Sequence, residues 1–277
     1  MKLTTYCFSP TGTSRQNMMA VVEGLGIENI MHHDLTLCDN DSSSFTLHTS
    51  FDVVIFSAPV YGGKIAPTAL ARIEQVRGEN TPAILLVTYG NRNFEQALSQ
   101  LADFVCQRGF RPIASAALVG EHSYSNATYP IAVGRPDATD LASAEEFGKR
   151  IAFKLKSQES IRQINVVEEM PRLETPEASL QAFRAFVQEY NRQQQINPVK
   201  VYPSASKDAC THCGDCITLC PTQAITLGNE EMSDPIRCIR CCACVKGCPS
   251  RARTFLSPFA KPLSENFQIR REPLYLL

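Results

Sequence analysis

Residues 210–221 have the sequence CTHCGDCITLCP, and residues 238–249 have the related sequence CIRCCACVKGCP. In both runs, two residues separate the first cysteine from the second and the second from the third. A fourth cysteine follows after three more residues, with a proline beside it. Every cysteine of the second run lies 28 positions after its counterpart in the first (238 minus 210, through 248 minus 220). The repeat indicates two copies of one small thiolate-rich unit.

This spacing resembles the cluster-binding run of bacterial ferredoxins, whose fourth cysteine serves the other cluster. Three thiolates placed so closely can wrap a tight loop around three irons of a cubane. The fourth, released from that loop by the proline, reaches the neighbouring cluster. By this rule one [4Fe–4S] cluster is held by Cys210, Cys213, Cys216 and Cys248. The second cluster is held by Cys238, Cys241, Cys244 and Cys220.

A structural zinc module and a disulfide framework are the alternatives. Zinc modules join two C-x-x-C pairs and lack a triplet followed by C-x-x-x-C-P. A disulfide framework is typical of a short secreted chain with a signal peptide, whereas residues 1–8 lead directly into a strand-like segment. Three other cysteines, Cys7, Cys38 and Cys106, are expected to be buried small hydrophobes. Cys242 breaks the spacing, so we expect it not to be a ligand.

Length and composition indicate an ordinary globular chain. The 277 residues favour about two domains, and a hydrophobic fraction of 44% is enough to bury a sizeable core. The net charge of -1 gives no argument for binding nucleic acid or a membrane surface. No apolar run approaches the roughly 18 residues that a membrane span needs. We therefore expect no nucleic-acid partner, no membrane span and a reducing, cytoplasmic location.

Strand-like and helix-like segments alternate through residues 1–157, which is typical of a parallel sheet covered by helices. The strand-like segments are residues 3–8, 30–37, 51–57, 83–87 and 110–119. The helix-like segments are residues 14–24, 67–76, 94–108 and 141–155. Residues 39–50, rich in Ser and Asp, are expected to form a loop in place of a helix. This pattern favours a doubly wound, flavodoxin-like, five-stranded parallel sheet over a barrel.

The rest of the chain divides into three ranges. Residues 158–200 form a connector whose helix starts near Thr175-Pro176-Glu177, and we expect its apolar stripe to pack between the domains. Residues 201–256 form a small α+β domain for the two clusters. Residues 257–277 form a tail with three prolines after Phe255. The sequence leaves open whether this tail packs back along the surface or frays.

A hydroxyl-rich segment, FSPTGTSR at residues 8–15, lies between the first predicted strand and the first predicted helix. In an open parallel sheet a ligand phosphate binds at this place, because the helix N-terminus presents unpaired N–H groups and favours an anion. Gly12 lets the backbone curl against the phosphate, and no Lys follows it as in nucleotide-triphosphate loops. The alternative is a turn that only caps the helix.

The pattern Ser9-x-Thr11-Gly12-x-Ser14 resembles the phosphate loop of flavodoxins, with Ser in place of the last Thr. Residues 58–64 (APVYGGK) and 88–94 (TYGNRNF) resemble the two loops that flank the flavin ring, with Tyr61 and Tyr89 as aromatic candidates. By this resemblance, FMN would be bound by Ser9, Thr11, Gly12, Thr13, Ser14, Pro59, Tyr61, Gly62, Gly63, Tyr89, Gly90, Asn91 and Arg92.

The whole chain resembles the flavodoxin–ferredoxin fusion proteins of anaerobic bacteria. The resemblance implies a carrier, with no catalytic residue, that passes electrons between two [4Fe–4S] clusters and FMN and meets a redox partner protein. One alternative is a self-contained reductase of a quinone, nitro or sulfur compound, with residues 121–137 lining a substrate pocket. Another is a regulatory or scaffold protein with clusters but no flavin. The oligomeric state is not indicated by the sequence.

Overall fold

The computed structural model describes residues 1–37, 52–156 and 162–277. The chain divides into two compact units, and each is assembled from separate ranges. The first, here called the sheet unit, comprises Met1–Glu121, Gly134–Arg172 and Arg271–Leu277. The second, here called the cluster unit, comprises His122–Val133 and Leu173–Arg270. The loop expected over residues 39–50, together with Cys38, lies outside the described residues.

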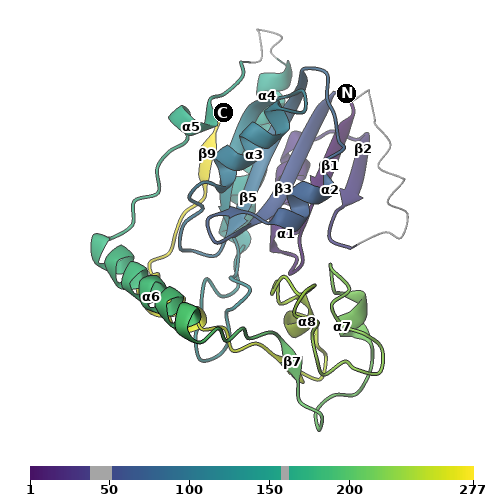
Figure 1. The fold of residues 1–277 in the computed structure, drawn as a ribbon. Coiled ribbons are helices and arrows are strands. Elements are labelled where there is room, and N and C mark those ends of the chain that lie inside the picture. The colour runs from purple at the N-terminus through teal and green to yellow at the C-terminus, as the bar shows by residue number, and fades with distance from the viewer. Residues whose placement is uncertain (38–51, 157–161) are drawn as a thin grey trace. The chain divides into compact units, whose positions relative to one another are not determined.

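The sheet unit is built on five parallel strands (Figure 1). They are β1 (Leu3–Cys7), β2 (Ile30–Asp34), β3 (Val53–Tyr61), β5 (Thr81–Tyr89) and β6 (Phe110–Val119). Their order in the sheet is β2-β1-β3-β5-β6, and each neighbouring pair is parallel. This is the strand order of the flavodoxin-like doubly wound fold. The five-stranded parallel sheet predicted from the sequence is therefore confirmed.

Two short strands extend this sheet in the antiparallel sense. β4 (Lys64–Ile65) forms a hairpin with the end of β3. β9 (Leu274–Leu276), drawn in yellow in Figure 1, pairs with β6 at the edge of the sheet. The Tyr275 ring packs against Phe147 with centroids 4.7 Å apart, and its hydroxyl donates to Ser143 Oγ at 2.9 Å. The end of the tail is thus a strand of the sheet.

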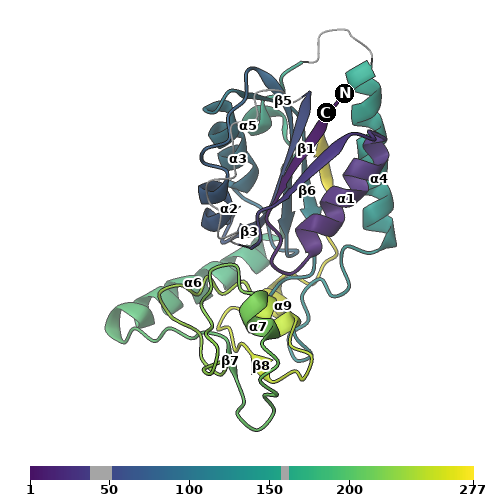
Figure 2. The same cartoon turned by 90° about the vertical axis from the view of Figure 1, so that its right-hand side faces the viewer.

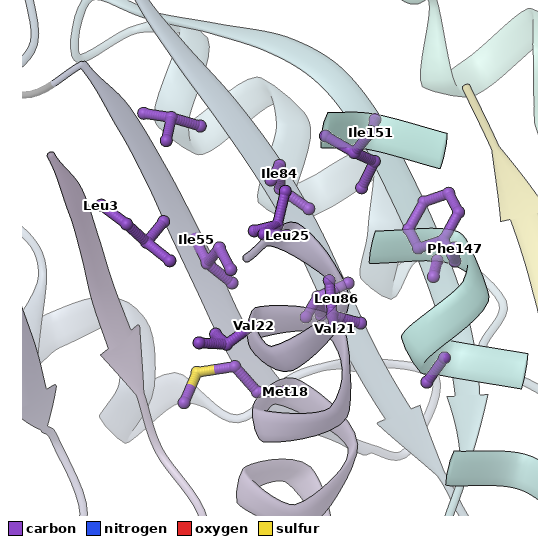
Figure 3. Packing of buried hydrophobic residues seen from close by; sticks show 14 of the residues in the cluster. Leu3, Met18, Val21, Val22, Leu25, Ile55, Ile84, Leu86, Phe147 and Ile151 are labelled. Carbon is purple, nitrogen blue, oxygen red and sulfur yellow. The ribbon is translucent and has the colours of Figure 1, made fainter. Parts of the chain in front are cut away.

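Helices cover both faces of the sheet. They are α1 (Thr13–Leu25), α2 (Pro67–Arg72), α3 (Ala97–Cys106) and α4 (Ala138–Lys156), with a short α5 (Val166–Glu169) following. Figure 2 shows α1 and α4 on one face and α2 and α3 on the other. Between α1, α4 and the strands lies a buried core that includes Val21, Ile55, Leu86 and Phe147 (Figure 3).

Glycines allow α1 and α4 to approach closely. A Cβ added to Gly24 would lie 1.9 Å from the Glu145 carbonyl oxygen, and one on Gly148 would lie 2.2 Å from that of Val21. Neither position therefore accepts a larger residue without moving a helix. This packing holds the C-terminal half of α1 against α4.

The cluster unit contains short elements and one long helix. These are α6 (Glu177–Ile196), β7 (Ser204–Ala205), α7 (Asp215–Thr218), α8 (Ala243–Lys246), β8 (Arg253–Thr254) and α9 (Ala260–Asn266). β7 and β8 pair in the antiparallel sense. The apolar stripe of α6 packs on α9 and its flanks: the rings of Phe186 and Phe259, and of Phe183 and Phe267, are 5.3 Å apart. Within the described residues, no helix is both long and apolar enough to cross a membrane.

Candidate cofactor sites

The two cysteine runs fold into loops with the same unusual backbone. Residues 28 positions apart share a positive φ: 53° at His212 and 55° at Arg240, and again 53° at Gln223 and 55° at Arg251. Helices α7 and α8 are also offset by 28 residues. The repeat predicted from the cysteine spacing is therefore present in the backbone conformation as well.

Each run contributes to two cavities in the cluster unit. The first cavity has about 300 Å³ of empty space, part of it open to solvent, and its cysteines are Cys210, Cys213, Cys216 and Cys248. The second has about 290 Å³, also partly open to solvent, and its cysteines are Cys220, Cys238, Cys241, Cys242 and Cys244. All of these cysteines are free thiols. The fourth cysteine of each run thus lines the cavity of the other run, which is the crossed arrangement that the ferredoxin resemblance implies.

The residues around the cavities suit an iron–sulfur cluster. Cysteine thiols line each cavity. Among the described residues, no three His, Cys, Asp or Glu side chains are placed to hold a single metal ion. Burial raises the pKa of Cys241 to about 12. This thiol therefore keeps its proton at neutral pH unless a strongly bound metal displaces it. The Ala224 N–H donates to Cys220 Sγ at 3.1 Å, a bond that stabilises a thiolate ligand.

Cys242 lines the second cavity beside its predicted ligands. It is 1% exposed, and its φ of 63° matches the 83° of Gly214, its counterpart in the first run. The Cys242 Sγ donates to the Arg240 carbonyl oxygen at 3.6 Å. A sulfur that donates this bond carries a proton, whereas a cluster ligand is a thiolate. That Cys242 is not a ligand stays a prediction.

Two charged residues of the cavities were not among the predicted site residues. Glu230 lines the first cavity and accepts from the Gly228 N–H at 3.0 Å and from His212 Nδ1 at 2.9 Å. These two bonds lower the pKa of Glu230 to about 2. Arg253 lines the same cavity and is 3% exposed. Arg253 could have been found from the sequence by extending the 28-residue comparison beyond the last cysteine of each run.

Residues 122–133 belong to the cluster unit. The Lys246 Nζ donates to the Ser125 carbonyl oxygen at 2.9 Å, and the Tyr124 ring lies 5.3 Å from that of Phe255. His122, a tempting proton donor in the sequence, accepts the Tyr124 N–H at its Nδ1 (3.0 Å). These contacts give the segment a structural role against the second cysteine run.

The loop between β1 and α1 offers backbone donors to an anion. Gly12 has a φ of 85°, and a Cβ there would meet nothing within 4 Å, so the loop opens on space. The Arg15 N–H donates to Ser9 Oγ at 3.0 Å. The N–H groups of Thr13 and Ser14 have no acceptor among the described residues. Two unsatisfied amides at the start of a 13-residue helix fit a phosphate group.

Buried polar groups lie beneath this loop. Ser14 and Asn17 are each 1% exposed. The Ser14 hydroxyl and the Asn17 Oδ1 find no hydrogen-bond partner in the part of the chain that the structure describes. Buried polar atoms are almost always satisfied in proteins, so a bound phosphate or water is the expected partner. The loop therefore fits the FMN phosphate that the flavodoxin resemblance implies.

The other two candidate loops lie at the same edge of the sheet, because β3 has β1 on one side and β5 on the other. Pro59 in β3 stands opposite Thr88 in β5. β3 continues to Tyr61 and turns through Gly62 and Gly63, with φ of 61° and 81°, into β4. Tyr61 is half-buried and Gly62 is exposed, so both have surface available to a ligand.

The loop after β5 differs from expectation in its side chains. Tyr89 is 2% exposed and packs edge-on against Phe94, with centroids 5.7 Å apart. Its ring has no free face for stacking on a flavin, which leaves Tyr61 as the better aromatic candidate. Asn91 is also buried, and its Oδ1 accepts the Arg271 N–H at 3.1 Å. Arg92 forms an ion pair with Glu95. Contacts of this loop with flavin remain a prediction.

Comparisons with known proteins agree with this architecture. Residues 202–225 match a family model described as a 4Fe-4S binding domain. A search of curated proteins gave no match. One similar structure is a flavodoxin from the domain Archaea, with 14% identity, a TM-score of 0.39 and coverage of 56% of this chain and 99% of that chain.

Two further structures show the same level of similarity. One is a flavodoxin of Streptococcus pneumonia TIGR4, with 15% identity, a TM-score of 0.41 and coverage of 56% of this chain and 99% of that chain. The other is rubredoxin oxygen:oxidoreductase from the anaerobe Desulfovibrio gigas, with 16% identity, a TM-score of 0.41 and coverage of 57% and 37%. These TM-scores are too low to support an inference, so the fold is identified by its strand order. The chain joins a flavodoxin-like α/β unit to a 4Fe-4S binding domain, which is the architecture of a flavodoxin–ferredoxin fusion.

Proposed function

We propose that this protein is an electron-transfer flavo-iron–sulfur protein with two [4Fe–4S] clusters and one FMN. The clusters exchange single electrons and FMN accepts one or two, so the combination lets one-electron carriers supply a two-electron step. The observation that carries the proposal is the crossed lining of the two cavities, in which Cys248 joins the first run and Cys220 the second. A redox partner protein would exchange electrons with the chain.

The cluster unit supplies ligands and excludes water. Three cysteines of one run and the fourth of the other surround each cavity, and apolar side chains fill the space between the runs. Ile225 is buried with Cys216 and Cys244, and Ile217 and Val245 pack against them. An apolar shell of this kind lowers the local dielectric constant and so helps to set the potential of a cluster.

The sheet unit would bind the flavin through its three loops. The phosphate would accept from the amides of Thr13 and Ser14 and from the hydroxyls of Ser9 and Thr11, since these lie at the N-terminus of α1. The ring would pack against Tyr61. The turn at Gly62 follows directly, and its positive φ permits backbone conformations that other residues rarely adopt.

Anaerobic purification with iron and flavin quantitation tests the proposal. We expect about eight irons and one FMN per chain, from two four-iron clusters and one phosphate site. Four irons would refute the two-cluster assignment, and absence of flavin would favour a scaffold with clusters only.

A matched pair of variants tests the flavin site. Gly12→Asp introduces a Cβ and a carboxylate into the phosphate loop, so we expect FMN to be lost and iron to be retained. Gly26→Asp is the control: Gly26 also has a positive φ and open space around its Cβ position, but it lies at the other end of α1. If both variants bound FMN equally, the phosphate site would be wrongly placed.

The reductase alternative has no observation in its favour. Its substrate pocket was expected from residues 121–137, and most of that segment packs within the cluster unit. Turnover of quinone, nitro and sulfur acceptors by the reduced protein distinguishes the two functions. We expect slow, unselective reduction, whereas saturable turnover of one acceptor would identify a reductase.

A further inference from the structure

A buried arginine breaks the symmetry of the two cysteine runs. Ile225 and Arg253 lie 28 positions apart, at equivalent places after the fourth cysteine of each run. Ile225 lines the second cavity and Arg253 lines the first, and each is 3% exposed. The repeat therefore places an apolar side chain at one cavity and a cation at the other.

The Arg253 guanidinium donates to backbone carbonyl oxygens and a hydroxyl group. Its Nη2 donates to the Pro203 carbonyl oxygen at 3.0 Å and to Ser233 Oγ at 2.6 Å, and its Nη1 donates to the Glu230 carbonyl oxygen. Its Nε has no acceptor, and no carboxylate forms an ion pair with it, among the described residues. A buried cation without an anion is costly. The Glu230 carboxylate lines the same cavity, but its oxygens accept from His212 and the Gly228 N–H and form no ion pair with Arg253.

Arg253 lies between the two cavities. Its side chain lines the first cavity. Its Nη2 donates to the Pro203 carbonyl oxygen and to Ser233 Oγ, and both of these residues line the second cavity. A [4Fe–4S] cluster with four thiolates is anionic, so a cluster in either cavity would supply the missing negative charge.

We infer that Arg253 is a buried counter-cation shared by the two clusters, and that it raises their reduction potentials. Each reduction adds a negative charge to a cluster, and a fixed cation in a low-dielectric interior stabilises the added charge. This inference rests on the two-cluster proposal. Arg253 is not a cluster ligand, and its counterpart in the repeat, Ile225, is not one either. Arg253 changes the reduction potentials of the clusters through its charge.

Three variants separate the charge from the hydrogen bonds. Arg253→Gln keeps N–H donors for the neighbouring carbonyl and hydroxyl oxygens but removes the charge. Arg253→Lys keeps the charge but loses the forked geometry. Arg251→Gln is the matched control, because Arg251 is exposed and its counterpart in the repeat is Gln223. Potentials are measured on the anaerobic, cluster-loaded full chain by EPR-monitored redox titration.

We expect Arg253→Gln to lower the equilibrium constant for cluster reduction at least tenfold, which corresponds to about 59 mV for one electron. Arg253→Lys should retain most of the wild-type potential. Arg251→Gln should change it less than Arg253→Gln does, because water and salt screen an exposed charge. Wild-type potentials in Arg253→Gln, or equal shifts in Arg253→Gln and Arg251→Gln, would overturn the inference.

Iron content distinguishes the remaining outcomes. Loss of cluster from Arg253→Gln but not from Arg253→Lys would support the counter-cation, whereas loss from both would indicate a purely structural side chain and overturn it. Four irons in the wild-type protein would refute the two-cluster proposal itself. Eight irons with unchanged potentials in the variants would refute only the role of Arg253.

Discussion

The crossed ligand sets can be tested by removing cysteines in pairs. Cys248 belongs to the second run in sequence but lines the first cavity, together with Cys210, Cys213 and Cys216. Cys248→Ala therefore takes away one of the four thiols around that cavity and none from the second. We expect this variant to lose the first cluster and keep the second, so that about four of about eight irons remain.

Two double variants then make the geometry decisive. Cys248→Ala with Cys213→Ala removes two thiols from the same cavity, so iron should stay at about four per chain. Cys248→Ala with Cys241→Ala removes one thiol from each cavity, so iron should fall to about zero. Both proteins have lost the same number of cysteines, and only the location of the second substitution differs.

The assay is iron and acid-labile sulfide per chain after anaerobic purification, with circular dichroism to confirm that the sheet unit is folded. The opposite pattern would refute the reasoning. If Cys248→Ala with Cys241→Ala kept about four irons while the pair with Cys213→Ala kept none, each run would hold its own cluster.

Other predictions concern the sheet unit. Gly148→Ala brings a Cβ to within 2.2 Å of a carbonyl oxygen of α1, so we expect urea denaturation to show a loss of about 1–3 kcal/mol. Arg135→Ala leaves the buried Asp140 carboxylate without its cation, and the same assay should show a loss of about 3–5 kcal/mol. Tyr61→Ala should weaken FMN binding in a fluorescence titration, whereas Tyr89→Phe should leave it unchanged because Tyr89 is buried. Burial raises the pKa of Tyr89 from 10.0 to about 12, so its contribution to stability is complete below pH 10 and is lost as pH rises to about 12. Tyr89→Phe should lack that step in the free energy of unfolding.

Local pattern was enough to predict much of the sheet unit. The strand at residues 110–119 is β6 with the same bounds, because Gly109 with its φ of 82° ends the preceding turn. The predicted helix over residues 14–24 is α1 with one more residue at each end. β3 extends beyond the predicted Ser57 to Tyr61, since the hairpin with β4 prolongs it. The crossed lining of the two cavities agrees with the arrangement that the ferredoxin resemblance implies, and the role of these cysteines as ligands stays a prediction.

Features that depend on distant partners were not predictable. The three residues of β9 become a strand only because β6, far away in the sequence, offers an unpaired edge. Tyr89 lies beyond the predicted strand at residues 83–87 and precedes Gly90, a pattern that favours an exposed loop, yet it is the last residue of β5 and packs against Phe94 in a buried position. The Asn91 Oδ1 accepts the Arg271 N–H, a contact between residues 180 positions apart that the sequence does not reveal. Propensity says nothing about such tertiary contacts.

The position of β9 has a consequence for biosynthesis. β9 completes the sheet edge with residues that follow the whole of residues 173–270 in the chain. Because the ribosome makes the chain from its N-terminus, β6 remains an open edge while every cysteine of the two runs is synthesised. Open strand edges recruit other chains and promote aggregation. Any cluster inserted during translation would therefore enter a chain whose sheet edge is still open, because β9 can pair with β6 only after residues 173–270 have been made.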